Sequence, residues 1–459
     1  SGKTLVLFVL LLPVLLSFAG LVIDGSLILG EHREVRHLAD AAAMAAAQER
    51  LLGGTAVDEL AAVNRVLELN NASDVEVDIH SIPISGPYAG KSDYVEVELT
   101  RTFRPHLFNL FGDQTIHVHA VAGIADATDH PAIVLLGSNP VPLALPAIGT
   151  IVPALPAQQA ALEMTGAGEF HVHNAIVVNS TWGGVDGKGD PSGIGPGPPW
   201  AVARIGTGKL ESKYVYTSGG VDDLKNYDNV SGSNDERILA NRRPVPDPLK
   251  NLPYPPYGPL TPERGSLLFD GNSPTTTILQ PGFYDWIQIN GGNVTFTPGT
   301  YIIKGANPET GIGLHVTGGD VTARGVMFYF DWTLWPGWGG VQPVTQPSVL
   351  IDLGSGTHEF TGLDDSISVF NAMTFFQHRN DRRPVILVNK KGVANRFEGA
   401  VYAKSAPIVL IGGGDCDAVF VADSMRVVLD TTSDDLRMHP DKKSNHMHLT
   451  PARDVFLVQ

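Results

Sequence analysis

The chain begins with a long apolar run that passes into an alanine-rich, amphipathic segment. Residues 5–23 (LVLFVLLLPVLLSFAGLVI) contain no charged side chain, and residues 31–52 are dominated by Ala, Leu, Glu, Arg, Met and Gln, which favour helix. The pattern predicts one helix over residues 3–52, in which Pro13 introduces a kink. Its first half is apolar on every side and must therefore be surrounded by lipid or by protein.

Two roles are open for the apolar half of this helix. At about 1.5 Å per residue it is long enough to cross a bilayer, so it can serve as a simple membrane anchor. It can also act as a pilin-type helix, which lies in the membrane before assembly and in the core of a filament afterwards. The positions that we expect to take part in assembly are Leu5, Phe8, Leu12, Pro13, Leu16, Gly20, Ile23, Asp24 and Gly25.

A different pattern follows between residues 53 and 130. Apolar positions at helical spacing predict a second helix over residues 55–69. Val, Ile or Leu then alternates with polar residues over residues 74–79, 94–102 and 115–123, which is the two-residue period of half-buried strands. A long helix with a small antiparallel sheet is a pilin-like architecture.

Short strands bounded by glycine dominate the rest of the chain. GGNVT at residues 291–295 recurs as GGDVT at residues 318–322, 27 residues later. Two looser echoes, QPGFY with TPGTY and AVYA with AVFVA, recur after 17 and 18 residues. Unequal periods of this size, with helical patterns nearly absent, favour the coils of an irregular right-handed parallel β-helix. A β-sandwich uses the same short strands and stays open as the alternative.

The predicted fold class is α+β, with three parts. Residues 1–52 form the helix, residues 53–130 a small pilin-like unit, and residues 131–459 a Gly- and Pro-rich β-solenoid body. Gly- and Pro-rich loops at residues 183–200 and 246–262 are expected to be excursions on the solenoid surface. The tail ends on an apolar Phe-Leu-Val, which can add a terminal strand or cap an end of the β-helix.

Charge and composition narrow the function. The chain has a formal net charge of −16, and charged residues make up only 17% of it. Because phosphate backbones are bound by clustered Lys and Arg, we expect no nucleic-acid partner. The single cysteine, Cys416, excludes an intrachain disulfide framework and a Cys-rich zinc site. We also expect no cofactor.

Candidate chemistry is sparse in the predicted body. Asp364 and Asp365 are the best adjacent carboxyl pair for glycoside hydrolysis, although an acidic surface turn is the simpler interpretation. An aromatic cluster in a Gly/Pro loop can stack on sugar rings or anchor an interface. Its tryptophans are Trp332, Trp335 and Trp338. A weaker hypothesis is a surface metal site formed by His439, His446 and His448.

The amino-terminal order of motifs resembles TadG-like proteins of tight-adherence (Flp-type) pili. Leu12-Pro13 lies inside the apolar stretch, Asp24-Gly25 follows it, and an ADAAA segment lies at residues 39–43. The resemblance covers about the first 50 residues and extends more loosely to residue 127. It implies a surface protein linked to pilus assembly or to pili themselves. One departure is Leu5, because major pilins carry a glutamate at this position.

The favoured hypothesis is a non-enzymatic cell-surface structural protein. Its hydrophobic helix would assemble it, with copies of itself or with pilus-assembly components, into or onto an extracellular filament that displays the β-helix body for adhesion. Before assembly, the helix would be inserted in the inner membrane. The alternative is a membrane-anchored β-helix protein that binds or degrades carbohydrate. A groove around Asp364 and Asp365 with a third acid or a base would favour this alternative.

Overall fold

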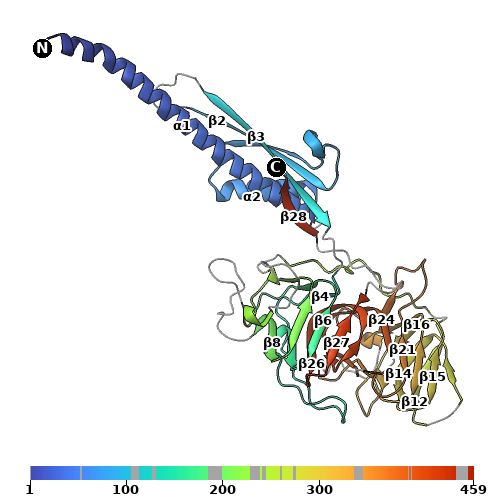
Figure 1. Cartoon of the computed structure of the whole chain (residues 1–459). Coiled ribbons are helices and arrows are strands. Elements are labelled where there is room, and N and C mark those ends of the chain that lie inside the picture. The colour runs from blue at the N-terminus through green and yellow to red at the C-terminus, as the bar shows by residue number, and fades with distance from the viewer. Residues whose placement is uncertain are drawn as a thin grey trace. The chain divides into compact units, whose positions relative to one another are not determined.

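The computed structural model divides the chain into two compact units (Figure 1). The first comprises Ser1–Thr128 with Ala452–Gln459, and the second comprises Asp129–Pro451. The sequence pattern places residues 131–459 in one body, whereas in the structure the last strand belongs to the first unit. The residues that the structure describes are 2–51, 54–104, 113–126, 131–183, 199–227, 238–239, 244–258, 261–271, 275–334, 345–390, 392–393, 395–440 and 453–458.

Helix α1 (Gly2–Leu51) is one continuous helix, as the sequence predicts. Only its second half lies along the sheet of the first unit, and its first half continues beyond it (Figure 1). The buried face of that second half is mostly alanine, which lets the helix backbone lie close to the strands. Its buried hydrophobic residues are Val35, Leu38, Ala39, Ala42, Ala43, Ala46 and Ala47. Among the residues described, no helix has the length and hydropathy needed to cross a bilayer.

The first unit completes its core with a second helix and an antiparallel sheet, both of which the sequence predicts. Helix α2 (Ala56–Leu69) begins after Thr55, whose backbone N–H donates to Asp58 as part of a capping box. The sheet has the order β1 (Val75–His80), β2 (Tyr94–Phe103), β3 (Gln114–Asp126) and β28 (Arg453–Val458), all antiparallel. The C-terminal tail therefore covers the free edge of β3. A short 3-10 helix, η1 (Gly86–Tyr88), lies between β1 and β2.

The second unit is a β-rich body of short strands. The strands of its amino-terminal half are β4 (Ile133–Leu135), β5 (Ala160–Gly166), β6 (Glu169–Val172), β7 (Ile176–Val178), β8 (Trp200–Gly206), β9 (Lys209–Ser212), β10 (Val215–Thr217) and β11 (Ile238–Leu239), with 3-10 helix η2 (Leu224–Tyr227). Those of its carboxy-terminal half are β12 (Glu263–Phe269), β13 (Thr277–Leu279), β14 (Gly282–Ile289), β15 (Asn293–Phe296), β16 (Gly299–Ile303), β17 (Leu314–Val316), β18 (Asp320–Ala323), β19 (Val326–Phe330), β20 (Val349–Asp352), β21 (His358–Phe360), β22 (Met373–Gln377), β23 (Val385–Val388), β24 (Arg396–Ile411), β25 (Gly414–Asp415), β26 (Asp417–Leu429) and β27 (Asp435–Met438), with 3-10 helix η3 (Trp332–Leu334).

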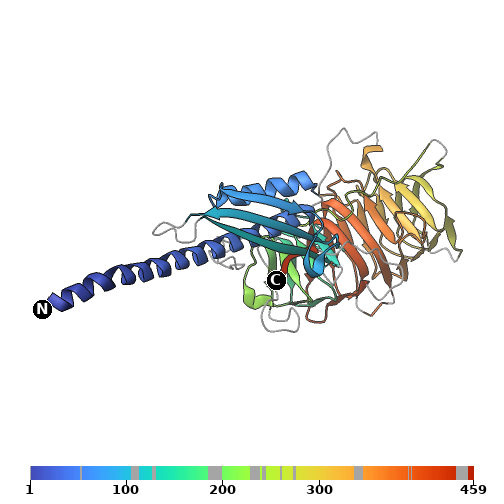
Figure 2. The same cartoon turned by 90° about the horizontal axis from the view of Figure 1, so that it is seen from above.

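Many strands of the body pair in parallel with the third strand along the chain. Thus β14 pairs with β17, β15 with β18 and β16 with β19, each time in register at 27 residues. The GGNVT and GGDVT repeats are stacked directly, because Asn293 pairs with Asp320 and Val294 with Val321. Gly292 and Gly319 precede these strands with φ of +80° and +81°, a conformation that favours glycine. Figure 2 shows the strands stacked in order from yellow to red.

The chain enters the body in its middle and not at an end. The first strands then stack in one direction along the body. Strand β4 pairs with β7 and β7 with β10, while β5 pairs with β8 and β6 with β9. The chain then crosses to β12 and returns turn by turn to β26 and β27. There β26 pairs with β4 and β5, and β27 pairs with β6. We call this pairing the seam, and it joins strands that are distant in sequence.

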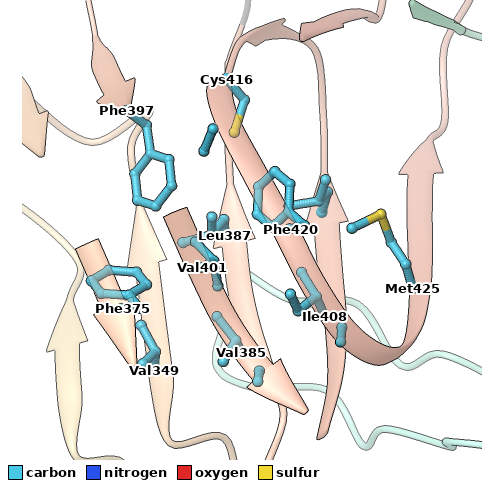
Figure 3. Packing of buried hydrophobic residues seen from close by; sticks show 14 of the residues in the cluster. Val349, Phe375, Val385, Leu387, Phe397, Val401, Ile408, Cys416, Phe420 and Met425 are labelled. Atoms are coloured by element: carbon cyan, nitrogen blue, oxygen red, sulfur yellow. The ribbon is translucent and has the colours of Figure 1, made fainter. Parts of the chain in front are cut away.

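The interior of the body is a continuous apolar core. Stacked strands place aromatic rings next to one another inside it, such as Phe328 with Phe375 at 5.8 Å and Phe375 with Phe397 at 5.5 Å between ring centroids. Figure 3 shows Phe375, Val401 and Phe420, from three stacked strands, in the same interior. Cys416 is buried here as a free thiol, and burial raises the pKa of this thiol well above its ordinary value.

Candidate functional site: the exposed helix and the surface of the body

The first half of α1 exposes large apolar side chains around its circumference. Phe8, Leu15 and Phe18 are each more than 60% exposed, far above what such side chains show in a folded core. Among the described side chains of this helix, the other large apolar ones that are exposed are Leu11, Leu12, Leu21, Val22, Ile23, Leu27, Leu29 and Met44. A contiguous apolar surface of this kind marks an interaction site.

The expected assembly residues divide between two environments on this helix. Phe8, Leu12 and Ile23 are exposed, whereas Gly20 and Asp24 are buried and Gly25 is half-buried. A side chain added at Gly25 would meet no atom within 4 Å, so this glycine leaves room on the helix surface. Leu5, Pro13 and Leu16 lie in the helix, but their side chains fall outside the described part of the structure.

Arg101 holds the second half of α1 to the sheet. Its guanidinium, in β2, donates to Glu31 Oε2 and Glu34 Oε1 of the helix, both at 3.1 Å, and to Asp74 Oδ1 at 2.9 Å. The hydrogen bond from Arg101 lowers the pKa of Asp74, because it stabilises the ionised carboxylate. Arg101 itself is only 8% exposed. No periodic pattern along the chain predicts this cluster, because its members are far apart in sequence.

A second arginine joins the end of α1 to the rest of the first unit. Arg50 Nε donates to Glu59 Oε1 of α2 at 2.9 Å, and Arg50 Nη1 donates to the carbonyl oxygens of Ser92 and Tyr94 at 3.0 Å. Glu59 also accepts a hydrogen bond from Ser81. The two arginines therefore fix one half of the helix and leave its apolar half to extend.

Comparison with known proteins adds one finding to this geometry. Residues 2–49 match the family model Tad, putative Flp pilus-assembly TadE/G-like. The match covers α1 almost to its end and no residue of the β-rich body. No curated protein and no solved structure gives a significant match to this chain. The exposed apolar surface and the Arg101 contacts to Glu31 and Glu34 thus both lie on the TadE/G-like helix.

The carboxyl pair proposed for catalysis lies in the body, on an exposed turn between β21 and β22. Asp364 and Asp365 are both exposed. The side chain of Asp365 accepts a hydrogen bond from the backbone N–H of Ile367 at 3.1 Å, and its own N–H donates to Asn371 Oδ1 at 3.0 Å. Asp365 therefore stabilises its own turn, which agrees with the simpler interpretation of this pair.

The structure describes only some of the histidines and tryptophans that the sequence analysis singles out. His439 lies at the end of β27, where its ring is 5.1 Å from that of His173, while His446 and His448 lie outside the described residues. Within the part of the chain that the structure describes, no group of His, Cys, Asp and Glu could hold a metal ion. Trp332 is half-buried in η3, and Trp335 and Trp338 also lie outside the described residues.

A proline-rich segment that the sequence places on the surface is an ordered strap. Residues 244–258, which we call the strap, pass over an outward-facing row of side chains in the body. Tyr402 donates to Asp247 Oδ2 at 2.7 Å, and Arg379 donates to the carbonyl oxygens of Leu249 and Leu252. Tyr254 stacks on His378 at 4.8 Å, with ring planes 4° apart. The covered row is Phe283, Ile302, Tyr329, Phe376 and Tyr402, which are neighbours in consecutive strands.

A second proline-rich segment covers another outer face of the body. Residues 143–155 fold back on themselves, with Leu145 bridged to Leu155 and Ile148 to Val152. They pack on a row of apolar side chains from successive strands, which includes Leu350, Ile386, Val409 and Val428. Because successive side chains of a strand point to opposite faces, some apolar side chains of the body point outward. Each of the two proline-rich segments buries a row of these side chains.

Proposed function

We propose that this chain is a non-enzymatic, pilus-associated cell-surface protein. It assembles through α1 into or onto an extracellular filament, with copies of itself or with pilus-assembly components, and displays the β-rich body on that filament. The observation that carries the proposal is the exposed apolar surface of α1, which lies in the segment that matches the Flp pilus-assembly family.

Hydrophobic packing would supply the free energy of assembly. Burying a side chain such as Phe8 or Phe18 contributes about 1.5–3 kcal/mol, and the helix presents many such side chains together. Gly25, with open space around it, would let a neighbouring helix approach closely. Because residues 5–23 contain no charged side chain, apolar contacts would align the helices along this stretch.

The body would be displayed as a right-handed parallel β-helix. Parallel pairing of β14, β15 and β16 with the third strand along the chain supports this architecture, as does the direct stacking of the GGNVT and GGDVT repeats. Insertion of residues 5–23 in the inner membrane before assembly stays a prediction from the uncharged sequence. Alkaline extraction of membranes tests it, because an inserted chain stays in the membrane pellet.

A membrane-anchored, polysaccharide-degrading protein is the competing proposal. It would need two carboxyl groups on either side of a bound sugar. The exposure of Asp364 and the use of Asp365 in its own turn weaken this reading. Asp364→Asn with Asp365→Asn would abolish any glycan cleavage by this pair and leave filament assembly unchanged.

A pair of substitutions on α1 tests the proposed assembly. Leu15 and Phe18 are neighbours on one helix face and are 61% and 68% exposed, so Leu15→Lys with Phe18→Lys would charge this face. We expect the amount of the chain in sheared surface filaments to fall at least tenfold. Val57→Lys is the matched control, because Val57 is 75% exposed on α2. Unchanged recovery of the double variant in filaments would overturn the proposal.

A further inference from the structure

We infer that the strap forms a carbohydrate-binding platform for neutral polysaccharides. Tyr254 and Tyr257 are 42% and 41% exposed, although the rows beneath them are buried. A tyrosine that only closed a core would bury its ring, whereas these two keep a large part of their surface open to solvent. Tyrosine side chains that are exposed to this extent can stack on the apolar faces of sugar rings.

Contacts with side chains of the body hold the rings of Tyr254 and Tyr257. Tyr254 lies parallel to His378, and the guanidinium of Arg379 lies 4.9 Å from its ring centroid. Tyr257 packs edge-on against Phe283 at 5.3 Å. Pro255 and Pro256 separate the two tyrosines and restrict the backbone between them. The platform therefore pays little conformational entropy when a ligand binds.

The spacing of the two rings suits an extended chain of sugars. Tyr257 contacts Phe283 in β14, and Tyr254 lies 6.4 Å from Tyr329 in β19. Tyr254 also contacts Phe376 in β22 and His378 just after it, so the two anchor points are two to three strand spacings apart, or about 10–14 Å. Two rings of one polysaccharide can cover both tyrosines at this separation.

The charges beside the platform favour a neutral glycan. Lys304 already pairs with Glu263 at 2.7 Å and with Asp285 at 3.4 Å, and Arg379 donates to Tyr402 and to the strap carbonyls. The whole chain carries a formal net charge of −16, which repels polyanions. Stacking and hydrogen bonding, not ion pairing, would therefore provide the affinity.

Calorimetric titration of the full chain with defined oligosaccharides tests this inference. The probes are hexameric cello-, chito- and xylo-oligosaccharides, with oligogalacturonate as the anionic comparison. We expect binding of at least one neutral hexamer and about a tenfold loss of affinity for each of Tyr254→Leu and Tyr257→Leu. Leucine keeps the apolar cover of the row beneath and removes only the flat ring, so these variants should fold.

Two further variants make the outcome decisive. Tyr254→Phe retains the ring and should bind within threefold of the unchanged protein. Tyr214→Ala, at a half-buried tyrosine elsewhere on the body, should not change affinity. Failure of every neutral probe to bind, binding of oligogalacturonate alone, or equal binding by the leucine variants would each overturn the inference. None of these results bears on filament assembly, which depends on α1 and is measured separately.

Discussion

Single charged side chains decide how α1 is held. Arg101 is nearly buried and meets three carboxylates, two of them on the helix, so its removal would leave them without their common partner. We predict that Arg101→Met destabilises the first unit by about 1–3 kcal/mol, measured by chemical unfolding. Arg104→Met is the control, because Arg104 is largely exposed and its ion pair with Asp113, at 3.4 Å, lies on the surface. Equal stability of the two variants would contradict this role.

The cluster around Arg101 also makes the stability of the first unit depend on pH in the acid range. Because the pKa of Asp74 is lower in the folded protein than its ordinary value of 3.8, ionised Asp74 stabilises the fold above that value. The contribution disappears as the pH falls through the lowered pKa. The stability gap between Arg101→Met and the unchanged protein should therefore shrink below about pH 4.

A buried ion pair crosses the seam of the body. Glu163 in β5 and Arg426 in β26 are register neighbours with 2.7 Å between Oε1 and Nε, and both are buried. We predict that Glu163→Leu alone costs about 3–5 kcal/mol in unfolding free energy, since it leaves a buried charge. The double variant with Arg426→Met should recover most of that loss. A double variant as unstable as the single one would contradict the pairing.

Asp423 gives the body a measurable pH dependence. Burial raises the pKa of this carboxyl from 3.8 to about 6, although the charge of Arg382 opposes the shift. The folded state thus holds the proton more tightly, and stability falls as the pH rises from about 4 to about 6. We predict that the unfolding free energy of Asp423→Asn, relative to that of the unchanged protein, rises by about 2–3 kcal/mol across this pH range. A stability difference between Asp423→Asn and the unchanged protein that stays constant over this pH range would refute the assignment.

At the level of elements, sequence echoes predict stacking only where the register is preserved. The GGNVT repeat stacks on GGDVT at its own period, and a glycine with positive φ precedes each of the two strands. The AVYA echo is displaced by one residue, so that Tyr402 pairs with Val421 and not with Phe420. A shift of one residue exchanges the inner and outer faces of a strand. Residue identity alone could not settle this register.

The strap shows a second limit of sequence patterns. A proline-rich passage predicts an exposed excursion, and the sequence gives no sign that Asp247 would meet Tyr402, which is far along the chain. We predict that Asp247→Ala speeds amide exchange in residues 249–254 at least tenfold, because it removes the hydrogen bond from Tyr402. Asp365→Ala should leave the exchange of these amides unchanged. Protection that survives Asp247→Ala would show that the aromatic contacts alone hold the strap.

At the scale of the whole molecule, the sequence predicts local elements well and distant pairings poorly. Helices α1 and α2 and strands β1, β2 and β3 follow from periodicity, because each depends on its own side chains. The seam and the return of β28 to β3 join segments that are far apart in sequence. No local period encodes such pairings, which form only when the chain folds as a whole.

Assembly through α1 is the central claim, and cryo-electron microscopy of sheared surface filaments, with this chain identified by mass spectrometry, tests it most directly. The account predicts a repeating subunit in which residues 5–23 pack against the same segment of neighbours in a central core. Recovery of the chain only as discrete particles from detergent-extracted membranes would contradict it.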